Sequence, residues 1–284
     1  MEYFLNKGSV LMKNIVGFLG AGSMAEAIIA GMTAKNVLPN DQIYATNQSN
    51  RERLKEIEQT YDIRTTTSKQ ALLQKSDIVV LAMKPKHVKE SLAEIKELLR
   101  EDTVIVSILA GISTSFIEQQ LIGNNPVIRV MPNTSAMIGE SATTIAAGDK
   151  ATVEQMEIVQ RLMQSIGTTT MIKEEEMDAY TAVAGSGPAF YYYMVEAIEE
   201  FAVEQGLDME TAKPLINQTI KGVSAMLGTS LESPAVLRKK ITSPGGTTEA
   251  GLQTLAEHDF KQAVIACLKQ TTERSKQMRE LFEK

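Results

Sequence analysis

Two short glycine-containing segments are the clearest candidates for chemistry in this chain. The first is GAGSMA at residues 20–25, and the second is SPGGTT at residues 243–248. Each directly precedes a predicted helix, and the free N–H groups and the dipole at a helix N-terminus favour anions. The net charge of −6 provides no general attraction for an anion. We therefore expect any anionic ligand to be bound by local groups of this kind.

The first segment has the G-x-G-x-x-A form of a dinucleotide-binding fingerprint. It follows the apolar run NIVGFLG and opens a predicted helix, which is the context that the fingerprint requires. Gly20 permits the tight turn, Gly22 lets the backbone approach a pyrophosphate, and Ala25 allows close packing of helix on strand. A purely structural strand–turn–helix is the alternative. The predicted phosphate-binding loop also includes Ala21, Ser23 and Met24.

The residues after the next predicted strand indicate which dinucleotide to expect. An NAD site usually has Asp or Glu there to bind the ribose 2′-OH, whereas this chain has TNQSNR at 46–51. Asn47 and Ser49 can hydrogen-bond a 2′-phosphate, and Arg51 can neutralise it. We therefore expect NADPH in preference to NADH. Arg51 alone is equally consistent with a solvated residue at the start of a helix.

Further segments follow later predicted strands and are expected at the same edge of the sheet. In LAMKPKH at 81–87, the residues expected to face the cofactor are Ala82, Met83, Lys84 and Pro85. Lys84 is either a catalytic acid, a loop charge or a residue whose backbone alone matters. The segments ILAGIS at 108–113 and VMPNT at 130–134 would frame the nicotinamide.

The second glycine segment interrupts helical sequence with Pro244, Gly245 and Gly246. It is either a plain corner between helices or a place where the backbone comes close to a ligand. Glycines remove side chains so that backbone N–H groups can converge on a small anion. Thr247 and Thr248 would then add hydroxyl donors.

The elements that must position these segments change in kind along the chain. Strands are predicted at 14–20, 42–46, 77–83, 103–109, 127–131, 142–146 and 168–172, and helices between them at 23–35, 51–59, 87–99 and 151–164. This alternation predicts an α/β, Rossmann-type, mostly parallel and doubly wound sheet over residues 13–173. Residues 1–12 are expected to be an N-terminal extension.

After residue 173 the strand patterns end, which predicts an all-α domain over 174–284. Helices are expected at 176–205, 209–228, 246–257 and 259–283. Pro214 lies within the second of these, so we expect a kink or a later start. The apolar stripes of these helices are explained either by a core within the chain or by a dimer of interlocked helices.

Composition excludes several classes of protein. An acidic chain without basic runs is not expected to bind nucleic acid or an anionic membrane. One cysteine and two histidines predict neither a disulfide framework nor a metal site. The chain has no run of 18 apolar residues, so no membrane span is expected. Its N-terminus does not resemble a signal peptide. We therefore expect a cytoplasmic protein.

The order and spacing of the motifs resemble those of pyrroline-5-carboxylate reductase over residues 13–280. The motifs that carry this resemblance are GFLGAGSMAEAIIAG, LAMKPKH, SILAGIS, RVMPNTSAMIGES, AGSGPAF and SPGGTTEAGL. The resemblance implies reduction of 1-pyrroline-5-carboxylate to L-proline with NADPH, or less often with NADH. It also implies a homodimer formed by interlocking C-terminal helices, from which higher assemblies are built.

The resemblance assigns roles to particular positions. Ala110 would lie near the nicotinamide, and Ser186 and Gly187 would lie beside the substrate. Thr247 and Thr248 match positions that bind the substrate carboxylate. Solvent can protonate the imine nitrogen near neutral pH, so a strong protein acid is not required. Because a threonine is a poor acid, Thr248 is only a weak candidate for a proton relay.

Two other functions fit the same domain plan. A hydroxyacid dehydrogenase would be expected to have a catalytic lysine on the first long helix after the Rossmann domain, but TAVAGSGPAFYYYMVEA has none. A non-catalytic NADP-binding regulator would be expected to lose the PGGTT turn, which this chain keeps.

Overall fold

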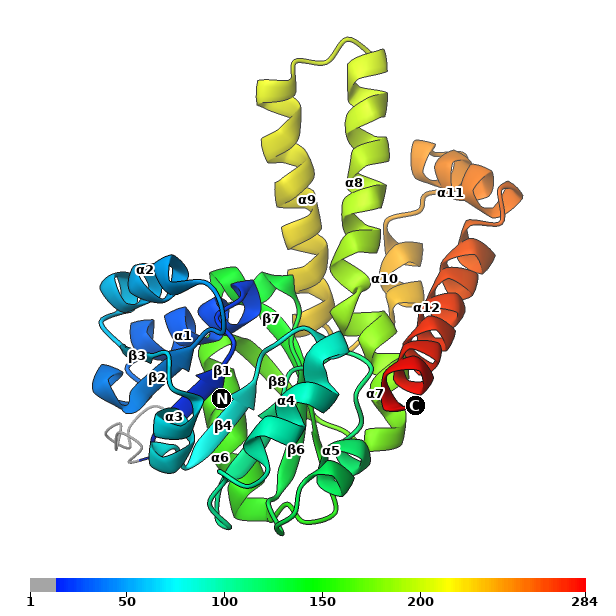
Figure 1. Cartoon of the computed structure of the whole chain (residues 1–284). Coiled ribbons are helices and arrows are strands. Elements are labelled where there is room, and N and C mark those ends of the chain that lie inside the picture. Colours follow the sequence, from blue (N-terminus) through cyan, green and yellow to red (C-terminus); the bar gives the residue numbers. More distant parts are fainter. Residues whose placement is uncertain (1–13) are drawn as a thin grey trace. The chain divides into compact units, whose positions relative to one another are not determined.

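A computed structural model describes residues 14–284 (Figure 1). The predicted N-terminal extension, residues 1–12, lies outside these residues. The chain forms two compact units. One comprises the described residues through Ser186 together with Thr271–Lys284, and the other comprises Gly187–Gln270. No helix within residues 14–284 is long and apolar enough to cross a membrane.

The first unit contains one eight-stranded sheet with the strand order β3-β2-β1-β4-β5-β6-β7-β8. Its strands are β1 (Val16–Leu19), β2 (Ile43–Thr46), β3 (Arg64–Thr66), β4 (Ile78–Leu81), β5 (Val104–Ser107), β6 (Val127–Met131), β7 (Ser141–Ala147) and β8 (Gly167–Met171). Neighbouring strands are parallel except β6 and β7, which are antiparallel. The predicted mostly parallel α/β sheet is therefore confirmed. The strand β3 was not predicted, because its three residues contain no apolar run.

Helices cover both faces of this sheet (Figure 1). One face packs against α1 (Ser23–Ala34), α2 (Arg51–Tyr61) and α6 (Val153–Met163). The other packs against α3 (Lys69–Lys75), α4 (Val88–Ile95) and α5 (Thr114–Gln120). Because both faces are covered, every residue of β1, β4 and β5 is buried. This burial explains why these strands are continuous apolar runs.

The predicted helix 176–205 is wrong as a single element. The chain instead forms α7 (Met177–Tyr180), a π-helical turn at Thr181–Gly185, and α8 (Gly187–Glu204). Pro188 lies at the start of α8 and has no N–H to continue a regular helical ladder. The irregular turn immediately precedes the Ser186–Gly187 pair for which a substrate role was predicted.

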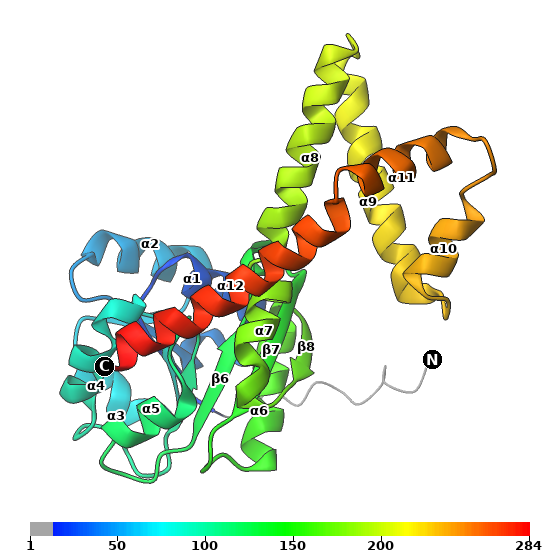
Figure 2. The same ribbon diagram turned by 90° about the vertical axis from the view of Figure 1, so that its right-hand side faces the viewer.

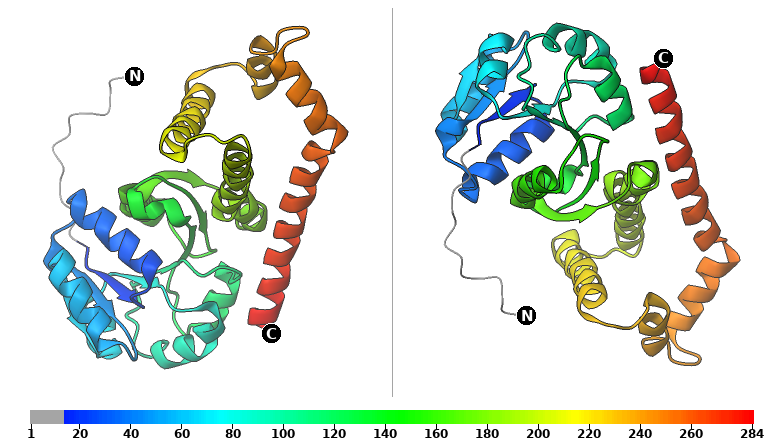
Figure 3. Two further views of the ribbon diagram at one scale, coloured as in Figure 1. Left: turned by 90° about the horizontal axis from the view of Figure 1, so that it is seen from above. Right: turned by 90° about the horizontal axis from the view of Figure 1, so that it is seen from below.

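All regular elements of the second unit are helices. It contains α8, α9 (Met209–Thr229), α10 (Pro234–Lys240) and α11 (Thr247–Glu257), and α12 (Phe260–Glu283) leads back into the first unit. Figures 2 and 3 show α8 and α9 side by side. The later start expected from Pro214 is wrong, since the Asp208 side chain accepts hydrogen bonds from the first-turn N–H groups of Glu210 and Thr211. The short helix α10 was not predicted.

Candidate functional site

The ends of β1, β2 and β4 meet at one edge of the sheet. The N–H of Gly20 donates to the carbonyl of Thr46 at 3.0 Å, and the N–H of Ala82 donates to the carbonyl of Leu19 at 3.0 Å. The strand order reverses on either side of β1. In open α/β sheets this point of reversal, at the carboxyl ends of the strands, is where ligands bind.

The two glycines of the first motif are required for different reasons. Gly20 has a φ of +119°, and a Cβ at this position would lie 2.5 Å from the carbonyl oxygen of Ala82. Gly22 has an ordinary φ of −78°, and a Cβ there would meet no described atom within 4 Å. Gly20 is therefore needed by the fold, whereas the open space at Gly22 fits the close approach of a pyrophosphate. Ala25 is 1% exposed and packs in the core.

The N-terminus of α1 carries a carboxylate whose charge is already balanced. Glu26, in the first turn, forms an ion pair with Arg53 and accepts a hydrogen bond from the Tyr61 hydroxyl at 3.2 Å. Arg53 also bonds Glu56, and its side chain donates to the Ala21 carbonyl at 3.4 Å. The hydrogen bond to Glu56, and the weaker one to Glu26, raise the pKa of Arg53 against the effect of burial. Sequence reasoning missed this pair, which keeps Glu26 from repelling an anion at the helix end.

The three residues predicted to bind a 2′-phosphate lie together in the loop between β2 and α2. The side-chain oxygen of Asn47 accepts from the N–H groups of Ser49 and Asn50 at 3.2 and 3.1 Å. This turn leaves the Asn47 amide N–H groups available as donors. Ser49 and Arg51 are exposed, and Arg51 is the first residue of α2.

The segment after β4 has the predicted location. Ala82 and Met83 are half-buried, Lys84 is exposed, and Pro85 opens a short 3-10 turn. Ala110, which follows β5, is half-buried and packs against a small apolar cluster that includes Met131 and Met177.

Part of the ILAGIS segment contacts the C-terminal helix, a use that was not predicted. Gly111 has a φ of +71°, and a Cβ there would lie 3.1 Å from the Cβ of Met278. The N–H of Ser113 donates to the Glu283 carboxylate at 2.7 Å. The glycine and the serine of this motif therefore hold the end of α12.

The local geometry of the PGG turn accounts for both of its glycines. Gly245 has a φ of +70°, and its N–H donates to the Glu249 carboxylate at 2.7 Å. The N–H of Gly246 donates to the Ser243 carbonyl at 3.0 Å. Both glycine N–H groups are therefore bonded within the turn. The remaining donors are the hydroxyls and N–H groups of Thr247 and Thr248, both exposed at the N-terminus of α11.

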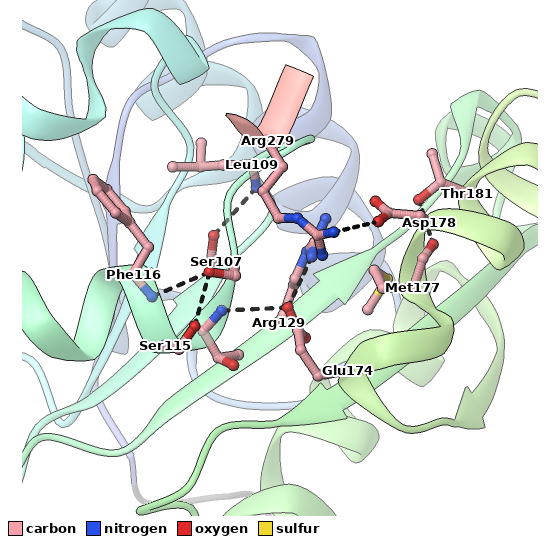
Figure 4. Close-up of polar contacts among 12 residues, drawn as sticks. Ser107, Leu109, Ser115, Phe116, Arg129, Glu174, Met177, Asp178, Thr181 and Arg279 are labelled. Atoms are coloured by element: carbon pink, nitrogen blue, oxygen red, sulfur yellow. Dashed lines mark hydrogen bonds and ion pairs between the residues drawn. The ribbon is translucent and has the colours of Figure 1, made fainter. Parts of the chain in front are cut away.

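A buried polar cluster lies beside the carboxyl edge of the sheet, and the sequence motifs did not indicate it (Figure 4). Arg129 on β6 is fully buried and pairs with Glu174 at 2.8 Å. Nearby, Asp178 accepts from Ser275 at 2.7 Å and pairs with Arg279 at 3.3 Å. Burial raises the pKa of the Glu174 carboxyl, and the Arg129 guanidinium opposes that rise. A lone arginine in the apolar strand VIRVM is the signal that could have predicted this pair.

The fold and the glycine loop at the reversal point of the sheet define a nicotinamide-dinucleotide-dependent oxidoreductase with a Rossmann-type domain. Two family models match the chain: "NADP oxidoreductase coenzyme F420-dependent" over residues 15–111 and "Pyrroline-5-carboxylate reductase dimerisation" over 174–278. Pyrroline-5-carboxylate reductase 1 of Bacillus subtilis is 44% identical over 269 residues, which cover 95% of this chain and 91% of that protein. The Arabidopsis thaliana enzyme is 36% identical and covers 92% of this chain and 95% of its own length. The chain belongs to the pyrroline-5-carboxylate reductase family.

Solved structures agree with this membership. The pyrroline carboxylate reductase of Plasmodium falciparum, solved with NADP bound, superposes with a TM-score of 0.86 at 29% identity, covering 95% of this chain and 99% of that one. The reductase of Coxiella burnetii gives 0.87 at 30% identity, covering 94% and 99%. Prephenate dehydrogenase of A. aeolicus, at 14% identity and a TM-score of 0.52, shares the fold alone.

Proposed function

We propose that this chain catalyses the NADPH-dependent reduction of 1-pyrroline-5-carboxylate to L-proline. Its 44% identity to a pyrroline-5-carboxylate reductase over 95% of the chain carries the proposal. The open space at Gly22, next to the free first-turn N–H groups of α1, fits a bound dinucleotide. The purified protein is expected to oxidise NADPH when pyrroline-5-carboxylate is added. Absence of turnover would contradict the proposal and favour a non-catalytic NADP-binding protein, and turnover of a hydroxyacid instead would favour a dehydrogenase.

The reaction requires correct orientation of the substrate more than it requires an acid from the protein. A nicotinamide held by the loop 20–25 would supply a hydride for the imine carbon, and the imine nitrogen would take one proton. Solvent provides that proton near neutral pH, which agrees with the exposure of Lys84 and the absence of a histidine among the proposed site residues. The chain's task is to hold the ring and its carboxylate in a near-attack geometry. We assign carboxylate binding to Thr247 and Thr248, and the flank of the substrate to Ser186 and Gly187.

Thr248→Ala tests the carboxylate assignment. Loss of one hydrogen bond to a charged group is expected to raise KM for pyrroline-5-carboxylate by about 10-fold to 100-fold. A moderate fall in kcat is also expected. Steady-state kinetics at saturating NADPH measure both. Thr248→Ser keeps the hydroxyl and is expected to restore most of kcat/KM, whereas an unchanged kcat/KM for Thr248→Ala would remove Thr248 from the site.

Arg51→Gln tests the preference for NADPH. We propose that Asn47, Ser49 and Arg51 bind the 2′-phosphate, so loss of the guanidinium is expected to lower the NADPH/NADH ratio of kcat/KM by about 10-fold. Lys55→Gln, one turn further along α2, makes the same change in net charge and is the matched control. An equal effect of both variants would show that only the general field matters, and a parent enzyme that prefers NADH would contradict the assignment of the loop.

The helical unit is proposed to form a homodimer through its C-terminal helices. Large apolar side chains on α8 and α9 are exposed in the single chain, among them Phe201 at 57%, Leu215 at 64% and Met226 at 54%. Apolar surface of this kind is typical of subunit interfaces. The dimerisation model that matches residues 174–278 supports the same assignment. We further propose a cytoplasmic location. We also propose a functional division into a cofactor-binding domain over 13–173 and a substrate-binding and dimerisation domain over 174–284, although residues 174–186 and 271–284 belong to the first compact unit.

A further inference from the structure

Three alternate residues of β6 and the loop after it face one segment of the chain. Arg129, Met131 and Asn133 are spaced two apart in extended backbone, which places their side chains on one face. Arg129 pairs with Glu174 (Figure 4), and Met131 packs in the cluster that contains Met177. Asn133, only 7% exposed, donates from its side-chain amide to the Ala184 carbonyl at 3.0 Å. The strand therefore contacts the segment 174–184 at its start, along its length and at its end.

The lengths of the two segments match. Four residues of extended chain, from Arg129 to Asn133, span about 13 Å. Ten residues of helical chain, from Glu174 to Ala184, span about 15 Å. The segment thus runs along the strand in the same direction and is held at both ends. Its last held residue, Ala184, is two residues before Ser186.

The contact made by Asn133 replaces a hydrogen bond that the sequence cannot form. In an α-helix the carbonyl of Ala184 would accept from the N–H of residue 188, but that residue is proline. The chain instead forms a π-helical turn, in which the N–H of Ser186 donates to the Thr181 carbonyl at 2.8 Å. The Asn133 amide supplies the donor that Pro188 lacks.

The orientation of this amide is fixed by its two contacts. The side-chain oxygen of Asn133 accepts from the N–H of Ser135 at 3.0 Å, and the nitrogen faces a carbonyl, which can only accept. An exchange of the two atoms would place oxygen against oxygen and N–H against N–H. Asn133 therefore joins the loop after β6 to the end of the π-helical turn through specific donor and acceptor atoms.

We propose that Asn133 is a positioning residue for the substrate, because it fixes the π-helical turn and so the place of Ser186 and Gly187. This inference rests on the proposed role of these two residues beside pyrroline-5-carboxylate. Asn133 itself acts through Ala184. The pairing of Asn133 with Pro188 explains why the RVMPNT and SGPA motifs occur together in one chain.

Asn133→Asp is the informative variant, since it keeps the acceptor for the Ser135 N–H and replaces the donor to Ala184 by an oxygen. Loss of this donor is expected to raise KM for pyrroline-5-carboxylate by about 10-fold. The Kd for NADPH is expected to change little. The Tm is expected to fall, because the new carboxyl faces the Ala184 carbonyl oxygen without a donor, so KM and not Tm distinguishes this variant from its control. Asn125→Asp is the matched control, because Asn125 is also buried and also donates to carbonyls, those of Arg100 and Thr103. It is expected to lower Tm and leave KM unchanged.

A double-mutant cycle with Pro188→Ala tests whether the Asn133 amide compensates for the N–H that Pro188 lacks. Alanine restores an N–H at residue 188, so the effect of Asn133→Asp on KM in this background is expected to fall below about threefold, which is a direct coupling of the two positions. An equal effect in both backgrounds, or an unchanged KM for Asn133→Asp alone, would overturn the proposal.

Amide hydrogen exchange of residues 181–187 measures, independently of catalysis, whether the hydrogen bond from Asn133 to Ala184 holds the π-helical turn in place. We call this contact the clamp. Faster exchange in Asn133→Asp than in the parent protein is expected, and unchanged exchange would overturn the clamp. If the parent protein does not reduce pyrroline-5-carboxylate, the proposed function fails while the exchange experiment still decides the clamp.

Discussion

Replacing Gly22 by alanine is expected to weaken binding of the dinucleotide by about 100-fold, the effect of losing one to two hydrogen bonds to a charged group. The Tm of the free protein is expected to stay unchanged. A methyl group at Gly22 meets no described atom within 4 Å, and its φ of −78° suits any residue. The cost therefore arises only when phosphates approach the N-terminus of α1. Isothermal titration with NADPH and thermal unfolding without it measure the two quantities.

Gly20→Ala is the contrasting variant in the same loop. Its φ of +119° is strained for alanine, and the added Cβ would lie 2.5 Å from the Ala82 carbonyl oxygen. We expect a lower Tm for this variant even without a ligand. An equal loss of Tm in Gly22→Ala would show that Gly22 serves the fold, and an unchanged Kd would exclude the pyrophosphate from this position.

The sequence predicted those parts of the fold whose signals are local. Apolar runs located the central strands β1, β4 and β5, because strands buried on both faces must be apolar throughout. The predicted strands 142–146 and 168–172 rested on threonine and other β-branched residues, and β7 and β8 lie there. The glycine loop was predicted because a strand before it and a helix after it give the fingerprint its meaning. The strand β3, Arg64–Thr66, has no such run and was missed.

The remaining features depend on contacts between residues far apart in sequence. The π-helical turn depends on Asn133 as well as Pro188. These two residues are far apart in sequence, so the residues around 185 alone could not predict the turn. The role of Gly111 depends on the close approach of Met278, which lies 167 positions later. At the PGG turn the sequence pattern allowed two explanations that it could not separate. Its glycines suggested a ligand, but positive φ at Gly245 and the hydrogen bond of Gly246 to Ser243 account for them locally.

Arg129→Met is expected to lower Tm by about 10 °C, because removal of one partner of a buried ion pair costs about 3–5 kcal/mol. The fully buried guanidinium pairs with Glu174, which would be left as an uncompensated carboxylate. The pair itself is incompletely satisfied, since two nitrogens of Arg129 and one oxygen of Glu174 have no partner among residues 14–284. The double variant Arg129→Met/Glu174→Met is therefore expected to recover most of the lost Tm. Thermal unfolding at one fixed protein concentration compares the three proteins.

The deficit of Arg129→Met is expected to shrink as the pH falls from about 7.5 to about 5.5. Burial already raises the pKa of the Glu174 carboxyl, and loss of the opposing guanidinium raises it further. An acid with a raised folded-state pKa contributes stability at low pH and loses that contribution as the pH rises through this pKa. Protonation of Glu174 therefore relieves the variant in mild acid. The double variant lacks this carboxyl and is the matched reference, so the Tm of Arg129→Met relative to the double variant is also expected to rise as the pH falls over this range. A deficit of Arg129→Met that does not change with pH would show that lost packing, and not the buried charge, determines the cost.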